Sequence, residues 1–212
     1  MKRNVLFALL ATLPLTLVAQ DAPKAEEKPK AEAKPKADAK PAMSEKEMME
    51  IWQKMATPGD AHKKLEPFVG SFTAKVKMWM APGAPPEESE GTSEAKWALG
   101  NRYVEQRFEG AFMKQPFSGI GFTGYDNYKK RYVGVWMDSM GTAMMTTTGT
   151  ADAAGKKFTS SGKMDDPVQK KTTTMKEVMT LVDNDNHHFE MWGPGPDGKM
   201  FKTMEITYTR KK

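Results

Sequence analysis

The 212-residue sequence contains no cysteine, which excludes disulfides, zinc–thiolate sites, thiol catalysis and lipid attachment through a thiol. It also lacks a concentrated basic stretch. The formal net charge is only +5, and lysines are interspersed with acidic residues throughout the domain. Nucleic-acid binding requires basic residues gathered on one face, so no nucleic-acid partner is expected.

Motifs that would indicate catalysis are missing as well. There is no G-x-S-x-G, no phosphate-binding loop and no H-E-x-x-H. Gly119, Gly121 and Gly124 have the spacing of a dinucleotide fingerprint but lie in a strand–turn–strand pattern, which favours a packing role. Asp183–Asn186 begins like a calcium loop, but its sixth position is His188 instead of glycine. We therefore predict no catalytic residue and no metal site.

The longest apolar run lies at the start of the chain. Lys2 and Arg3 precede an apolar stretch from Val5 to Val18, and small Ala19 follows. This pattern is typical of a secretory signal peptide over residues 1–20, cleaved after Ala19 or Gln20. The run is short for a membrane span, so no transmembrane segment is expected after cleavage. The sequence thus predicts an exported protein, periplasmic or secreted.

Residues 21–42 are of low complexity and contain only Ala, Lys, Glu, Asp and Pro. No apolar side chain larger than alanine is available to offset the entropy of ordering, and a proline recurs every six residues. We predict a disordered linker here, followed by one folded domain over residues 43–212.

A short helix is predicted over residues 44–56. Ser44 and Glu47 form a capping-box pattern. An apolar stripe then follows at helical spacing: Met48, Ile51, Trp52 and Met55. We expect this stripe to cover one end of the domain that follows.

From residue 68 onward the apolar pattern changes to period two, interrupted by turn residues. About ten strands are predicted: 68–80, 90–98, 102–112, 117–125, 131–138, 142–151, 157–164, 170–182, 187–192 and 200–210. The connections are too short for crossover helices, so consecutive strands are antiparallel neighbours. Closure removes the exposed edges of such a sheet, which favours an all-β, up-and-down barrel over a sandwich.

Several motifs in this region resemble a known family. They run from Pro58-Gly59 and His62 through Leu99–Arg102, Gly124–Asn127 and Trp136–Met140 to Lys202–Arg210. Over residues 55–212 the sequence is similar to the bacterial DUF1579 domains, a family with no established activity. The resemblance implies a lipocalin-like (calycin) barrel around a central cavity.

Calycin barrels carry a Gly-x-Trp motif on the first strand, covered by a basic residue from the last strand. Gly70-Ser71-Phe72 matches the spacing, with phenylalanine in place of tryptophan. Arg210 is the candidate basic partner, and the resemblance implies that these residues close the barrel.

A barrel of this size can enclose a small ligand. Alternation places Val76, Met78 and Met80 on the inward face, and it leaves polar Gln106 and Glu177 within apolar rows. These two side chains either orient a ligand, or face outward, or are satisfied within the core. The predicted partner is a small apolar or amphipathic molecule, bound by inward-facing residues: Met78, Trp97, Gln106, Phe108, Trp136, Glu177 and Met179.

Two alternatives stay open at this stage. The first is a hydrolase or isomerase that uses carboxylates at the barrel rim together with His62, and the second is a structural or interaction module. The eighteen methionines favour an adaptable core over a copper site. His187 and His188 point to opposite faces of one strand, and a lone histidine is weak support for haem. No cofactor is predicted.

Overall fold

The computed structural model describes residues 43–166 and 170–212. The predicted signal peptide and linker lie outside the described residues. Three short helical segments precede the strands: α1 (Glu45–Ala56), α2 (Asp60–Lys63) and the 3₁₀ helix η1 (Glu66–Phe68). None of the described helices is long and apolar enough to cross a membrane.

Ten strands follow, and together they confirm the predicted count. Their bounds are β1 (Gly70–Met78), β2 (Glu87–Ala98), β3 (Tyr103–Phe112), β4 (Gln115–Asp126), β5 (Arg131–Asp138), β6 (Met145–Ala151), β7 (Lys157–Asp166), β8 (Lys171–Leu181), β9 (Asn186–Pro194) and β10 (Met200–Arg210).

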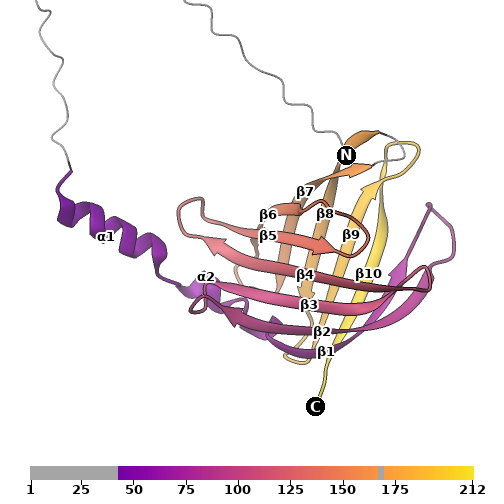
Figure 1. Ribbon diagram of the computed structural model, residues 1–212, viewed down its shortest axis with the longest axis horizontal. Helices are drawn as coiled ribbons and strands as arrows, with labels where there is room; N and C mark the ends of the chain where they lie inside the picture. Colours follow the sequence, from indigo (N-terminus) through magenta and orange to yellow (C-terminus); the bar gives the residue numbers. More distant parts are fainter. Residues whose placement is uncertain (1–42, 167–169) are drawn as a thin grey trace, which may run out of the picture. The chain divides into compact units, whose positions relative to one another are not determined.

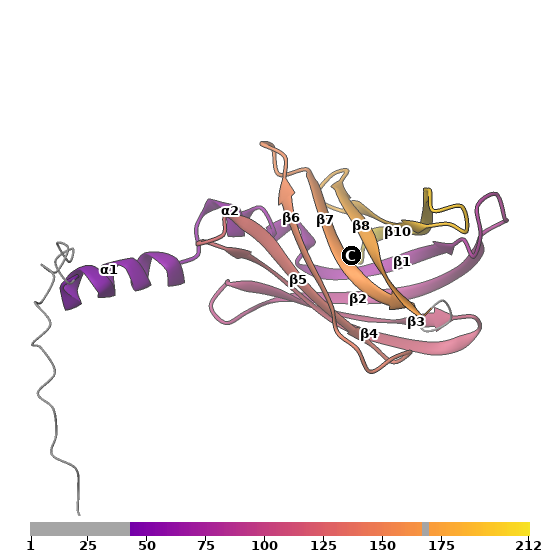
Figure 2. The same cartoon turned by 90° about the horizontal axis from the view of Figure 1, so that it is seen from above.

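Each strand pairs antiparallel with its neighbours in sequence, and β1 pairs with β10 to close the sheet into a barrel (Figures 1 and 2). The closing register runs from Phe72 opposite Arg210 to Met78 opposite Met204. The predicted closed barrel is therefore confirmed, and the sandwich is not formed.

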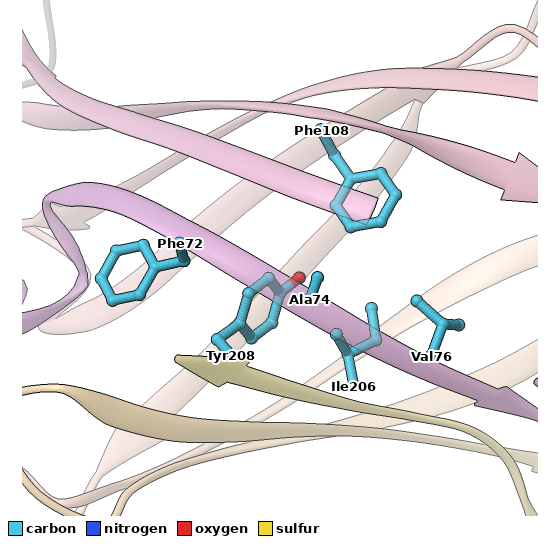
Figure 3. Packing of buried hydrophobic residues seen from close by; sticks show 6 residues of the cluster. All are labelled: Phe72, Ala74, Val76, Phe108, Ile206 and Tyr208. Atoms are coloured by element: carbon cyan, nitrogen blue, oxygen red, sulfur yellow. The ribbon is translucent and has the colours of Figure 1, made fainter. Parts of the chain in front are cut away.

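The alternation in β1 explains how this strand sits in the wall. Phe72, Ala74 and Val76 are buried, whereas Thr73 and Lys75 between them are exposed. The buried residues pack with Phe108, Ile206 and Tyr208 from strands β3 and β10 (Figure 3). This cluster is the main apolar core, and it lies on the inner side of the seam where the barrel closes.

A second cluster closes one end of the barrel. Leu65, between α2 and η1, is only 2% exposed and packs with Val104 and Tyr132. The Tyr132 hydroxyl donates to the carbonyl of Ala61, 2.8 Å away. Segment 60–68 thus forms a plug at the end where β1 begins.

The helix α1 begins as predicted, with the Ser44 hydroxyl and the Glu47 side chain completing a capping box. The expectation that its apolar stripe covers the barrel end is wrong. No residue of α1 is buried, and Ile51 and Trp52 are 48% and 65% exposed. The reason is that Leu65 and its neighbours already occupy that end. Contact with the barrel includes two hydrogen bonds, from Asn127 Nδ2 to the carbonyls of Met55 and Thr57.

Candidate functional site

The inward face of the barrel follows from the strand register. Residues opposite each other in an antiparallel ladder project to the same side of the sheet. Buried Phe72 pairs with Ser93, and Ser93 pairs with Phe108, so all three point inward. Following the register around the strands puts every residue predicted to contact a ligand on this face: Met78, Trp97, Gln106, Phe108, Trp136, Glu177 and Met179. Met80 lies beyond the end of β1 and is 68% exposed, so its predicted inward position is wrong.

Burial differs around the lumen. The wall formed by β1 and β10 is packed, whereas Gln106, Trp136 and Glu177 on other walls stay partly exposed. Thr123, which the register also places inward, is exposed. Solvent therefore reaches the inner face, and the packed seam fills only part of the lumen.

Trp136 lies flat against the inner wall because two glycines make room for it. A Cβ atom built on Gly119 would lie 2.2 Å from the Trp136 ring, and one on Gly121 would lie 2.8 Å from it. The indole Nε1 donates to Asp138 Oδ2 at 3.0 Å, which fixes the orientation of the ring. The glycines thus make room on the inner face for a large aromatic surface, which also packs against the main apolar core.

Glu177 is the charged group in the middle of the lumen wall. It accepts a hydrogen bond from the Ser160 hydroxyl at 2.9 Å, and the Thr147 side chain also hydrogen-bonds to it. Burial raises the pKa of the Glu177 carboxyl, and the two hydroxyl hydrogen bonds partly oppose that rise. Three adjacent strands, β6 to β8, thus contribute one polar side chain each to a hydrogen-bonded group on the inner wall.

Gln106, on β3, is the centre of a second group of polar side chains on the inward face. Its Nε2 donates to Ser93 Oγ at 2.9 Å, and its side chain hydrogen-bonds to the buried Tyr208 hydroxyl. Burial raises the pKa of Tyr208 well above its ordinary value, so this hydroxyl stays neutral. Both polar side chains singled out in the sequence therefore face inward and have partners there.

His187 also faces the lumen, and the sequence analysis did not select it. Its ring stacks on Tyr208, with 4.5 Å between centroids and an angle of 18° between the planes. Burial, and secondarily the charge of Arg210, lowers the pKa of His187 to about 4, so the imidazole is neutral. Its Nδ1 is buried without a hydrogen-bond partner. The alternation of His187 with Phe189 and Met191 was the available signal for an inward position.

Arg210 lies over Phe72, with its guanidinium carbon 4.6 Å from the ring centroid. Gly70 permits this approach, since a Cβ atom at that position would lie 2.2 Å from Arg210 Nη1. Gly70 also has φ = +135°, a conformation that favours glycine. The three residues from the first and last strands therefore meet at the closing seam.

His62 is placed for a structural role. It is 4% exposed, its Nδ1 accepts from the Gly59 amide at 3.0 Å, and its ring also hydrogen-bonds to the backbone of Tyr125. Desolvation lowers the pKa of His62. Within the described ranges no carboxylate hydrogen-bonds to this ring, so the acid–base pair imagined for an enzyme is not assembled around it.

The carboxylates at the barrel rim, Asp126 and Asp138, accept hydrogen bonds from turn amides, and Asp138 also accepts one from the Trp136 indole. Asp126 Oδ1 accepts from the amides of Tyr128 and Lys129, each at 2.8 Å. Asp138 Oδ1 accepts from the amide of Met140, in addition to the bond from Trp136. Both are Asx-type arrangements that stabilise strand ends.

The described part of the chain contains no group of three or more His, Asp or Glu side chains that could hold a metal ion. His187 points inward, whereas His188 points outward and contacts Thr207 through its Nδ1. The two rings therefore do not share a ligand site.

Two surface depressions in the described part of the chain lie beside the end of α1. One, of about 480 Å³, is an open depression beside the end of α1, lined by Gln53 and Pro58. The other, of about 210 Å³, lies between Met55, Tyr103 and Tyr128. Neither includes a residue predicted to contact a ligand.

Comparison with known proteins agrees with this architecture. The profile of the family described as "Protein of unknown function (DUF1579)" matches residues 57–210. The chain belongs to the DUF1579 family. No curated protein matches this DUF1579 chain.

Two solved structures are similar to this chain to different degrees. Rv2717c from M. tuberculosis matches the DUF1579 chain with a TM-score of 0.56 at 14% identity, covering 74% of this chain and 100% of that one. This likeness supports the barrel fold alone. A redesigned β-barrel matches with a TM-score of 0.38 at 11% identity, covering 70% of this chain and 96% of that one.

Proposed function

We propose that this protein binds a small apolar or amphipathic molecule in the lumen of its barrel. The observation that carries the proposal is the composition of the inward face. Phe108, Trp136 and Met179 supply apolar surface, and Gln106 and Glu177 supply polar groups. Binding sites for small molecules combine these two features, because apolar surface gives affinity and a few polar groups give orientation.

Access to the lumen supports the same proposal. Gln106, Trp136 and Glu177 are partly exposed although they point inward. A lumen packed solid would leave such side chains without solvent contact. The plug at Leu65 covers one end, so we propose that a ligand enters from the opposite end, where Met78 and Asp138 lie.

A neutral solvatochromic dye such as Nile red tests the proposal. We expect saturable binding with blue-shifted emission, and quenching of Trp97 and Trp136 fluorescence. Thr123→Phe adds a ring on the inward face at an exposed position, so it should weaken dye binding. Thr148→Phe, on the exposed outward face of β6, is the matched control. Absence of dye binding, together with no co-purifying small molecule in native mass spectrometry, would overturn the proposal.

We further propose that the protein is exported, on the basis of the signal-like residues 1–20. Amino-terminal sequencing of the protein from its native source tests this. A mature terminus at Gln20 or Asp21 supports export, and an intact Met1 contradicts it.

A further inference from the structure

Few charged side chains face the lumen. Away from the ends of the described strands, Glu177 is the charged residue on the inward face. Its neighbours along β8 and on β9 are apolar, namely Met175, Met179 and Met191, whereas on the β7 side it meets the Ser160 hydroxyl. A ligand that enters the middle of the lumen therefore meets an acidic group and no cation.

Arg210 does not provide the missing positive charge. It lies at the plugged end, and its guanidinium donates four hydrogen bonds to backbone carbonyls, those of Val69, Pro67 and, twice, Asn184. Its Nε also lies 3.3 Å from an Asp185 carboxylate oxygen. With these partners and the Phe72 ring beneath it, the guanidinium holds the closing strands together and does not face a ligand in the middle of the lumen.

The polar groups around Glu177 and around Gln106 differ in the hydrogen-bonding capacity that they leave for a ligand. At the first, Ser160 and Thr147 donate to the Glu177 carboxyl, and a carboxylate has acceptor sites beyond two. At the second, Gln106 bonds to Ser93 and to Tyr208, so its amide is already part of a network. In the middle of the lumen, the charged group that still has hydrogen-bonding capacity is therefore an acceptor, the Glu177 carboxylate.

We infer that the lumen selects apolar molecules whose polar end donates hydrogen bonds and carries no negative charge, namely alcohols or amines, and that it discriminates against carboxylates. This inference rests on the proposed function. It is argued from the inward position of Glu177, its two hydroxyl partners and the engagement of Arg210 elsewhere. Specificity of this kind comes as much from repelling the wrong ligand as from attracting the right one.

The test uses three molecules with the same chain and different ends: dodecylamine, dodecanol and dodecanoate. Each competes with Nile red for the full-length protein near neutral pH. We expect dodecanoate to bind at least about tenfold more weakly than either of the others. We also expect the amine to bind at least as tightly as the alcohol.

Glu177→Gln identifies the group responsible. It removes the charge and keeps the shape, so the amine should lose its advantage and dodecanoate should gain about tenfold relative to dodecanol. Glu109→Gln makes the same change on the exposed outward face of β3 and should leave all three ratios unchanged. Ratios within one variant cancel differences in the folded fraction, so the comparison between wild type and Glu177→Gln reports on the carboxylate itself.

The failures are distinguishable. If dodecanoate binds as tightly as dodecanol, or if none of the three displaces bound dye, the inference is wrong and the proposed function stands. Unchanged ratios in Glu177→Gln would also overturn it. If Nile red itself does not bind and no small molecule co-purifies, the proposed function fails and the inference falls with it.

Discussion

The guanidinium of Arg210 lies 4.6 Å from the centre of the Phe72 ring, across the strand pair that closes the barrel. Stacking of this kind and hydrogen bonds to a charged donor both contribute to stability. The same side chain ties β10 to the segment before β1 through the carbonyls of Pro67 and Val69. Arg210 therefore joins both ends of the barrel sequence at one point.

We predict that Arg210→Ala lowers the free energy of unfolding by about 2–4 kcal/mol, because it removes the stack and leaves partly buried carbonyls unpaired. Urea denaturation followed by circular dichroism measures this loss. Lys211→Ala is the control, since Lys211 lies next in sequence and makes only a 3.5 Å ion pair with Glu94 near the surface. A loss below about 0.5 kcal/mol for Arg210→Ala would contradict the role assigned to it.

The contact between Gly119 and Trp136 leads to a second prediction. Gly119→Ala places a methyl group within the indole ring's volume, so it should cost about 1–3 kcal/mol. In a Trp136→Ala background the same change should cost little, because the ring is gone. A double-mutant cycle of unfolding free energies measures this coupling. Equal costs in the two backgrounds would show that the ring does not rest on the glycine.

His187 predicts a pH dependence of stability. Its folded-state pKa of about 4 is below the ordinary value of 6.5. Between these two pH values the imidazole is protonated in the unfolded chain and neutral in the folded protein. The stabilising contribution is therefore present above pH 6.5 and is lost as the pH falls toward 4. The loss is on the order of 3 kcal/mol at most.

Urea midpoints between pH 7 and pH 4.5 for the wild type and His187→Phe isolate this contribution, since other groups titrate in both proteins. The wild type should lose more stability than the variant over this interval. Parallel curves would mean that His187 accepts a proton in the folded state.

The exposure of α1 gives a fourth prediction. Ile51→Ser should change the free energy of unfolding by less than about 0.5 kcal/mol, because the side chain is 48% exposed and covers nothing in the barrel. Leu65→Ser, in the plug, should cost more than about 2 kcal/mol. Thermal unfolding of the two variants compares them directly. A large loss in Ile51→Ser would indicate that α1 packs against the protein in solution.

Much of the fold could be predicted because its signal is local. Period-two alternation such as Phe72, Ala74 and Val76 marks a strand that faces a core, and short turns leave antiparallel neighbours as the available pairing. The same alternation placed Glu177 within an apolar row, and the strand register shows that this row faces inward.

Other features depend on contacts that alternation does not contain. The apolar stripe of α1 predicts a face but not its partner, and the plug at Leu65 had already taken the place expected for it. The inward position predicted for Met80 was wrong because β1 ends at Met78, so the alternation no longer applies there. The stacking of His187 on Tyr208 and the seat of Trp136 on Gly119 join residues from different strands, so only the three-dimensional register reveals them.

The closing pair of strands also has a consequence for how the chain folds. Thr73 and Thr209, which touch across the seam, are 136 positions apart in sequence. Contacts between such distant segments form late and slow folding. During folding β1 therefore keeps an open hydrogen-bonding edge until β10 pairs with it. Lys75 and Lys77 lie at alternate positions along β1, and charged residues of this kind discourage an unpaired edge strand from pairing with another chain.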